Sequence, residues 1–142
     1  MSSTKPGRRR VGREAAIQYL YCRELNSNDD PAASLESYWE VRPIRPEART
    51  FAEKLIAGVL QHEEQINEIL TEKLENYKIE RLAAVDRNIL RLAIHEILHR
   101  EDIPDPVSIN EAIEIAKRFG STESSGFVNG LLDSVRKSRT PS

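Results

Sequence analysis

Residues 79–100 read IERLAAVDRNILRLAIHEILHR, and this segment predicts the helix around which the rest of the chain packs. When each residue advances about 100°, the apolar side chains of the segment cover well over half of the helix circumference. They are Leu82, Val85, Ile89, Leu90, Leu92, Ala93, Ile94, Ile97 and Leu98. A helix that is apolar over so much of its surface must be covered on several sides, so we predict that it is central to the core.

The same helix contains HEILH, residues 95–99, which resembles the metal-binding core of a zinc peptidase. In such a site two histidines and a third ligand hold the metal, and the glutamate acts on the bound water. Here His95 and His99 fall on the polar strip of the helix, whereas Glu96 projects towards the apolar side. The remaining histidine, His62, is distant in sequence, and no spacing motif identifies another ligand. We therefore predict a solvated histidine pair without metal, and a zinc hydrolase is the alternative.

The orientation of Glu96 raises a separate question. A carboxylate on the apolar side of a central helix is expected to be buried, and a buried carboxylate requires a hydrogen-bonded or cationic partner. The sequence does not identify this partner.

Helical periodicity continues on the N-terminal side of this segment, and strand alternation does not occur there. Apolar residues recur at helical spacing in residues 12–25, 31–39 and 47–77, and the prolines of VRPIRP interrupt the pattern before the third stretch. Pro31 follows Asp30 and suits the first position of a helix. The third stretch is one long helix or two nearly collinear ones, because the polar run QHEEQ at residues 61–65 could contain a break.

Two further helices are predicted on the C-terminal side. Ser108 stands three residues before Glu111, the arrangement of a capping box, so we expect a helix to begin at Ile109. Gly120 is expected to end this helix in the left-handed conformation. A last helix is expected over about residues 122–137. The sequence as a whole therefore predicts an all-α protein.

Composition indicates one domain with an uneven charge distribution. The chain has 142 residues, of which 39% are hydrophobic and 31% charged, and this suits a soluble helical domain. Its first 13 residues contain five of the 21 basic side chains and no acidic one, so the remainder carries 16 basic and 23 acidic residues, a net charge of −7. Clustered arginines can neutralise phosphates, but basic tails are also common where nothing binds. Charge alone leaves both readings open.

Three parts are predicted along the chain: a flexible basic arm at residues 1–9, one helical domain at 10–137, and a disordered tail at 138–142. No apolar segment is long enough for a signal peptide or a membrane span, so we expect a cytoplasmic protein. Cys22 is the single cysteine, which excludes an internal disulfide, and its apolar surroundings IQYLYC predict a buried thiol.

Four motifs in this order resemble the NusB family of bacterial transcription antitermination factors. They are RRRVGREAAIQYLY (8–21), VDRNILRLAIHEIL (85–98), INEAIEIAKRFG (109–120) and FVNGLLD (127–133). The resemblance implies a compact bundle of about seven helices in two packed helical subdomains. It also implies that HEILH belongs to a packed helix and does not bind zinc.

For function, the resemblance implies an RNA-binding adaptor that has no catalytic activity and needs no cofactor. NusB proteins recognise boxA, a short single-stranded RNA element found also in ribosomal RNA leaders, together with NusE, a small-subunit ribosomal protein. The complex then joins other Nus factors on RNA polymerase. Homodimers occur in some relatives, so the resemblance is compatible with either a monomer or a homodimer.

The family's functional positions can be carried over to this chain. The arginine-rich motif corresponds to Arg8, Arg9, Arg10 and Arg13 as a phosphate clamp, and the aromatic residue of FVNG corresponds to Phe127, whose ring would stack on a base. By spacing alone, Phe127 would be a core residue of the last helix. The acidic positions that face NusE correspond to Asp86 and Glu123, although either could simply complement a helix N-terminus. Some relatives have a basic residue where this chain has Gly126, so a phosphate contact could be missing there.

The alternative to sequence-specific boxA recognition is a helical protein–protein adaptor whose basic arm binds RNA only nonspecifically. Binding of boxA in preference to a scrambled RNA separates these two hypotheses.

Overall fold

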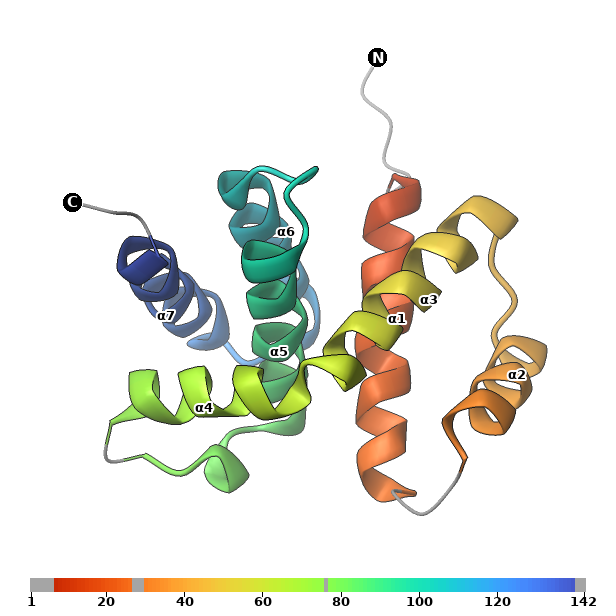
Figure 1. The fold of residues 1–142 in the computed structure, drawn as a ribbon, viewed down its shortest axis with the longest axis horizontal. Coiled ribbons are helices and arrows are strands. Elements are labelled where there is room, and N and C mark those ends of the chain that lie inside the picture. The colour runs from red at the N-terminus through yellow and green to blue at the C-terminus, as the bar shows by residue number, and fades with distance from the viewer. Residues whose placement is uncertain (1–6, 27–29, 76, 140–142) are drawn as a thin grey trace.

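The computed structural model describes residues 7–26, 30–75 and 77–139, so most of the predicted arm and the end of the predicted tail lie outside the described residues. Within these residues the chain forms seven α-helices and one 3-10 helix and no strand, which confirms the predicted all-α fold (Figure 1). The elements are α1 (Arg8–Leu25), α2 (Pro31–Val41), α3 (Pro46–Gln61), α4 (Glu63–Leu74), η1 (Ile79–Arg81), α5 (Ala84–His99), α6 (Asp105–Phe119) and α7 (Ser124–Arg139).

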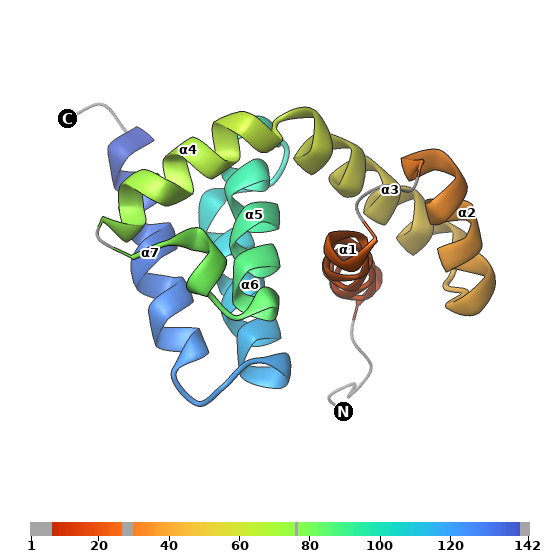
Figure 2. The same cartoon turned by 90° about the horizontal axis from the view of Figure 1, so that it is seen from below.

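The helices form two groups that pack against each other. In the view of Figure 2, α1, α2 and α3 lie on one side and α4, α5, α6 and α7 on the other. Helix α5 contacts α1 and α3 of the first group and α4, α6 and α7 of the second. Both groups contribute to one continuous hydrophobic core. The two packed subdomains are therefore confirmed, and α5 is the central helix, as its apolar circumference predicted.

Helix α5 begins later than predicted. Residues 79–81 form the separate 3-10 helix η1, and the backbone is extended at Leu82 (φ −69°, ψ 146°) and Ala83 (φ −57°, ψ 138°). The apolar spacing is continuous through this region, so periodicity alone did not reveal the interruption. Because of this break, Asp86 lies in the first turn of α5.

Helices α3 and α4 correspond to the two-helix alternative for residues 47–77. They are separated by His62, whose backbone (φ −106°, ψ 19°) departs from helical geometry within the polar run QHEEQ. Helix α2 begins at Pro31 as predicted, and the side chain of Asp30 accepts a hydrogen bond from the Ala33 amide at 3.2 Å.

The predicted start of the next helix is wrong, whereas its end at Gly120 is as predicted except for the conformation of this glycine. Helix α6 begins at Asp105, because a proline is tolerated in the first turn of a helix and Pro106 does not prevent it. Ser108 therefore lies inside α6, where its buried side chain donates to Glu96 and makes no capping box. Gly120 ends the helix with φ −93° and ψ −171°, an extended conformation and not the left-handed one.

Ion pairs between side chains join the C-terminal end of α1 to α5. Glu24 accepts hydrogen bonds from Arg87 Nε at 2.9 Å, Arg91 Nη1 at 2.8 Å and Asn88 Nδ2 at 3.3 Å. Burial raises the pKa of Glu24, but the donors from Arg87 and Arg91 outweigh it, so the pKa lies below its ordinary value. Much of the polar strip of α5 thus faces α1.

Two further expectations concern the surface. The predicted burial of the Cys22 thiol is wrong, because the residue lies on an exposed face of α1. None of the helices within residues 7–26, 30–75 and 77–139 has the length and apolar character that crossing a membrane requires.

Candidate nucleic-acid interface

The arginines of the N-terminal motif have different structural roles. Arg13 is only 2% exposed, and its Nε and Nη2 atoms donate to the two carboxylate oxygens of Glu96, each at 2.8 Å. Ser108 Oγ donates a third hydrogen bond to Glu96, also at 2.8 Å. Arg13 is therefore the partner of Glu96 that the sequence left unidentified. A guanidinium so deeply buried is not accessible to an RNA phosphate, so its predicted place in a surface clamp does not fit its position.

Arg10 is also engaged within the fold. Its Nε and Nη2 atoms donate to Glu111 at 2.8 and 2.6 Å, and Arg13 Nη1 adds a longer contact at 3.4 Å. The hydrogen bond from Arg10 lowers the pKa of the Glu111 carboxyl below its ordinary value. Arg10 and Arg13 thus fasten the first turns of α1 to α5 and α6.

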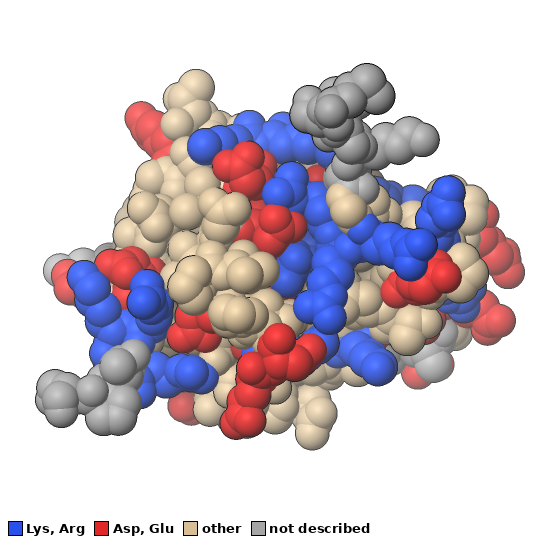
Figure 3. Space-filling view, turned by 90° about the horizontal axis from the view of Figure 1, so that it is seen from above, with Lys and Arg blue, Asp and Glu red and all other residues tan. Residues whose placement is uncertain are grey.

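Arg8 and Arg9 lie on the surface. Both belong to the first turn of α1, so these two residues of the predicted arm are helical. The Arg9 guanidinium lies 4.9 Å from the Phe51 ring centroid and 4.0 Å from an Asp102 oxygen, and more than half of its side chain is exposed. Figure 3 shows that Lys and Arg side chains gather in a band on the face seen from above. The described part of the motif therefore offers Arg8 and Arg9 as its accessible cations.

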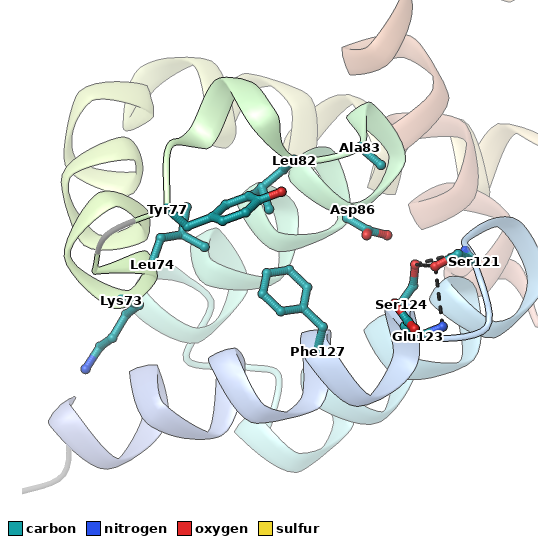
Figure 4. A pocket seen from close by; sticks show the side chains of 10 residues that line it. All are labelled: Lys73, Leu74, Tyr77, Leu82, Ala83, Asp86, Ser121, Glu123, Ser124 and Phe127. Carbon is teal, nitrogen blue, oxygen red and sulfur yellow. Dashed lines mark hydrogen bonds between the residues drawn. The ribbon is translucent and has the colours of Figure 1, made fainter.

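The second group of predicted site residues meets in a pocket of about 420 Å³ between α5, α7 and the segment after α4. Phe127 of α7 projects into this pocket next to Tyr77, and Asp86 lies on the other side of its ring, towards Ser121 (Figure 4). Phe127 is 37% exposed, so the core role suggested by its spacing is wrong. Sequence reasoning missed Tyr77, which is 50% exposed, because it lies between helices where no periodicity marks it.

The two acidic residues predicted to face NusE line the same pocket. Asp86 Oδ1 is buried and has no hydrogen-bond partner among the described residues. Glu123 is exposed at the turn before α7, where its amide donates to Ser121 Oγ at 3.4 Å. Ser124 Oγ accepts from the Ser121 amide at 2.9 Å and fixes this turn. The structure therefore brings Asp86, Glu123 and Phe127 together, apart from the arginine motif.

Comparison with known proteins assigns the chain to a family. Residues 10–137 match the family model described as NusB family. The chain belongs to the NusB family. It is 46% identical over 133 residues to the transcription antitermination protein NusB of Myxococcus xanthus, covering 91% of this chain and 94% of that protein. It is 48% identical over 131 residues to the protein of the same name from Desulfitobacterium hafniense, covering 92% of this chain and 88% of the relative.

Solved structures agree with this assignment. T. maritima NusB is 37% identical and superposes with a TM-score of 0.83, covering 97% of this chain and 96% of that structure. A crystal structure of the antitermination factors NusB and NusE in complex with dsRNA is 26% identical, with a TM-score of 0.83 and coverage of 92% and 97%. NusB-family proteins are RNA-binding transcription antitermination factors and not enzymes, so this chain is not assigned to a hydrolase class.

The histidines of this NusB-family chain are not the predicted solvated pair. His95 is only 4% exposed, and its ring covers Gly58, where an added Cβ would lie 2.1 Å from the ring. His62 stacks on His99 with ring centroids 3.7 Å apart and lies 5.9 Å from His95. The rings stack, and no group of described residues is arranged to hold a metal ion. Burial and the neighbouring imidazoles lower the pKa of His95 to about 4.

Proposed function

We propose that this NusB-family chain recognises boxA-type single-stranded RNA together with NusE in the cytoplasm. In this role it helps to assemble the antitermination complex, with other Nus factors, on RNA polymerase, including during ribosomal RNA transcription. The observation that carries the proposal is the exposed ring of Phe127 in a pocket that also contains Asp86, whose buried Oδ1 has no hydrogen-bond partner among the described residues. Support comes from relatives that are transcription antitermination proteins and from a similar structure of NusB and NusE with dsRNA.

RNA is bound in two ways, by charged contacts with its phosphates and by stacking on a base. Arg8 and Arg9 are the exposed cations that contact phosphates. Phe127 offers its ring to a base, a contact that contributes about 1 to 3 kcal/mol. Arg10 and Arg13 act indirectly, because their ion pairs with Glu111 and Glu96 fix the helix turn that carries the two exposed arginines.

For the protein side, Asp86 and Glu123 form the NusE contact. A buried carboxylate oxygen without a partner is costly, and a cationic or amide donor from a second protein would satisfy it. Glu123 is exposed at the rim of the same pocket and would contribute mainly to the electrostatic attraction of the partner. The proposal thus places the two partners next to each other, with Phe127 between them.

The test is fluorescence anisotropy of a boxA RNA and a scrambled RNA of equal length, with and without NusE. We expect a preference for boxA that increases with NusE. Equal weak binding to both RNAs, unchanged by NusE, would favour the adaptor that binds RNA nonspecifically.

The contribution of charge is measured with an Arg8→Ala/Arg9→Ala variant. Each lost phosphate contact on a single strand lowers the slope of log K against log salt by about 0.7. An unchanged slope would exclude both arginines from the clamp. The converse variant is Gly126→Lys, because a side chain at Gly126 meets no atom within 4 Å, and it should increase the slope if a phosphate passes this position.

A further inference from the structure

Beside Arg8 and Arg9, three elements of the fold meet at the aromatic ring of Phe51. Phe51 of α3 has three guanidinium groups around it, at 4.9 Å for Arg9, 5.3 Å for Arg13 and 5.4 Å for Arg100. Cation–π attraction explains why so many positive groups lie around one ring. The ring therefore concentrates positive charge at the junction of α1, α3 and the turn after α5.

A pocket of about 400 Å³ opens at this junction, and we call it the phosphate pocket. Its charged lining is predominantly basic, with four cationic side chains and two carboxylates. The cationic ones are Arg8, Arg9, Lys54 and Arg100, and the acidic ones are Glu47 and Asp102. Thr50 adds a hydroxyl from the same face of α3 as Lys54, four residues away. The pocket is thus cationic and rich in hydrogen-bond donors, which suits an anion.

Several of these donors are not used within the fold. Arg100 donates through Nε and Nη2 to Asp102 at 3.0 and 2.9 Å, which holds its guanidinium at the pocket, and its buried Nη1 has no hydrogen-bond partner among the described residues. Lys54 is exposed and forms no ion pair with any described residue. Helix α1 begins beside the pocket, where Gly7 makes no side-chain cap and the first turn of the helix contains no acidic residue, so the helix dipole adds positive potential there.

We propose that the phosphate pocket holds a backbone phosphate of the RNA strand bound by Arg8 and Arg9. Lys54 and Arg100 then extend the clamp from α1 to α3 and to the turn after α5. This inference rests on the proposed function, because the argument for RNA is continuity with the two exposed arginines that line the same pocket. A phosphate fits the unused donors, whereas an acidic peptide would bring further carboxylates towards Glu47 and Asp102.

Lys54→Ala tests the proposal, because Lys54 is exposed and its removal leaves the fold intact. Lys137→Ala is the matched control, since Lys137 lies on α7 outside the pocket and pairs with Asp133 at 3.0 Å. We expect Lys54→Ala to weaken binding of boxA and scrambled RNA equally, by about fivefold, and to lower the salt slope by about 0.7. Lys54→Glu should weaken binding further and Lys54→Arg should preserve it, while Lys137→Ala should match the unmodified protein.

The outcomes distinguish this inference from the proposed function. If Arg8→Ala/Arg9→Ala lowers the salt slope and Lys54→Ala does not, the phosphate pocket is rejected and the boxA proposal stands. If neither variant changes the slope, the arginine clamp and the pocket both fail. If Lys54→Ala weakens NusE binding in the absence of RNA but leaves RNA binding unchanged, the pocket is a protein contact, which would also overturn the inference.

Discussion

Helix α5 carries a fully buried carboxylate, Glu96, and a partly buried one, Asp86, and the surroundings of the two groups differ. Near its C-terminal end, Glu96 accepts two hydrogen bonds from Arg13 and one from Ser108. In its first turn, Asp86 has a buried oxygen with no partner among the described residues, beside a pocket that opens to solvent. A buried charge with all its partners specifies the fold, whereas one without a partner is available to a second molecule. The contrast separates the structural end of α5 from its binding end.

The largest expected effect comes from breaking the structural end. Arg13→Ala leaves the Glu96 carboxylate buried beside Ser108 alone, so we expect the free energy of unfolding to fall by about 3 to 5 kcal/mol. Urea denaturation followed by circular dichroism measures the change. Arg10→Ala is the control, because the Arg10–Glu111 pair is partly exposed and its loss should cost far less. Equal losses in the two variants would contradict the distinction between a buried and a partly exposed pair.

The buried histidine next to Glu96 predicts a pH dependence. Because the pKa of His95 is lowered to about 4 from an ordinary 6.5, the unfolded chain binds more protons than the folded chain between these values. Stability is therefore complete above about pH 6.5 and decreases as pH falls towards 4, by up to about 3 kcal/mol from this group. Denaturation at a series of pH values measures the slope. His95→Phe keeps a flat ring on Gly58 and should remove most of the slope in this window, and an unchanged slope would assign it to other groups.

The sequence predicted most helices because amphipathic periodicity is a local property. It could not predict the partner of Glu96, because Arg13 lies 83 residues away and its arginine motif suggested a surface role. The prediction at Ser108 failed for a related reason. Its spacing from Glu111 fits a local capping box, but its side chain forms a tertiary hydrogen bond with Glu96 instead. In the candidate site, family resemblance identified Phe127 and Asp86 separately, and only the structure shows that they share a pocket with Tyr77, which no pattern marks.

Phe127 of α7 lines the same pocket as Asp86, so its substitution tests the binding end of α5. Phe127→Ala should weaken boxA binding by about 1 to 3 kcal/mol, because a stacked ring is lost. The unfolding free energy should change little, since the ring lies at the surface of a pocket and not in the core. Anisotropy and denaturation on the same preparation separate the two quantities. Phe127→Leu is the matched control, because it keeps apolar volume without a ring, and full RNA affinity in this variant would argue against stacking.

The smallest change in stability is expected at Asp86. Substituting this residue is the most direct test of the contrast between the two ends of α5. Asp86→Asn removes a carboxylate whose buried Oδ1 has no hydrogen-bond partner among the described residues. The loss of a favourable helix-dipole interaction is therefore offset by the lower cost of burying a neutral amide. The unfolding free energy should stay within about 1 kcal/mol. Glu96→Gln should destabilise the fold far more, because the buried Arg13 loses its two short hydrogen bonds to a carboxylate and keeps only the longer contact with Glu111 at 3.4 Å. Affinity of Asp86→Asn for NusE should fall about tenfold or more, and Glu123→Gln at the exposed rim should have a much smaller effect. If Asp86→Asn destabilised the fold as much as Glu96→Gln, both carboxylates would be structural and the binding role of the α5 N-terminus would be lost.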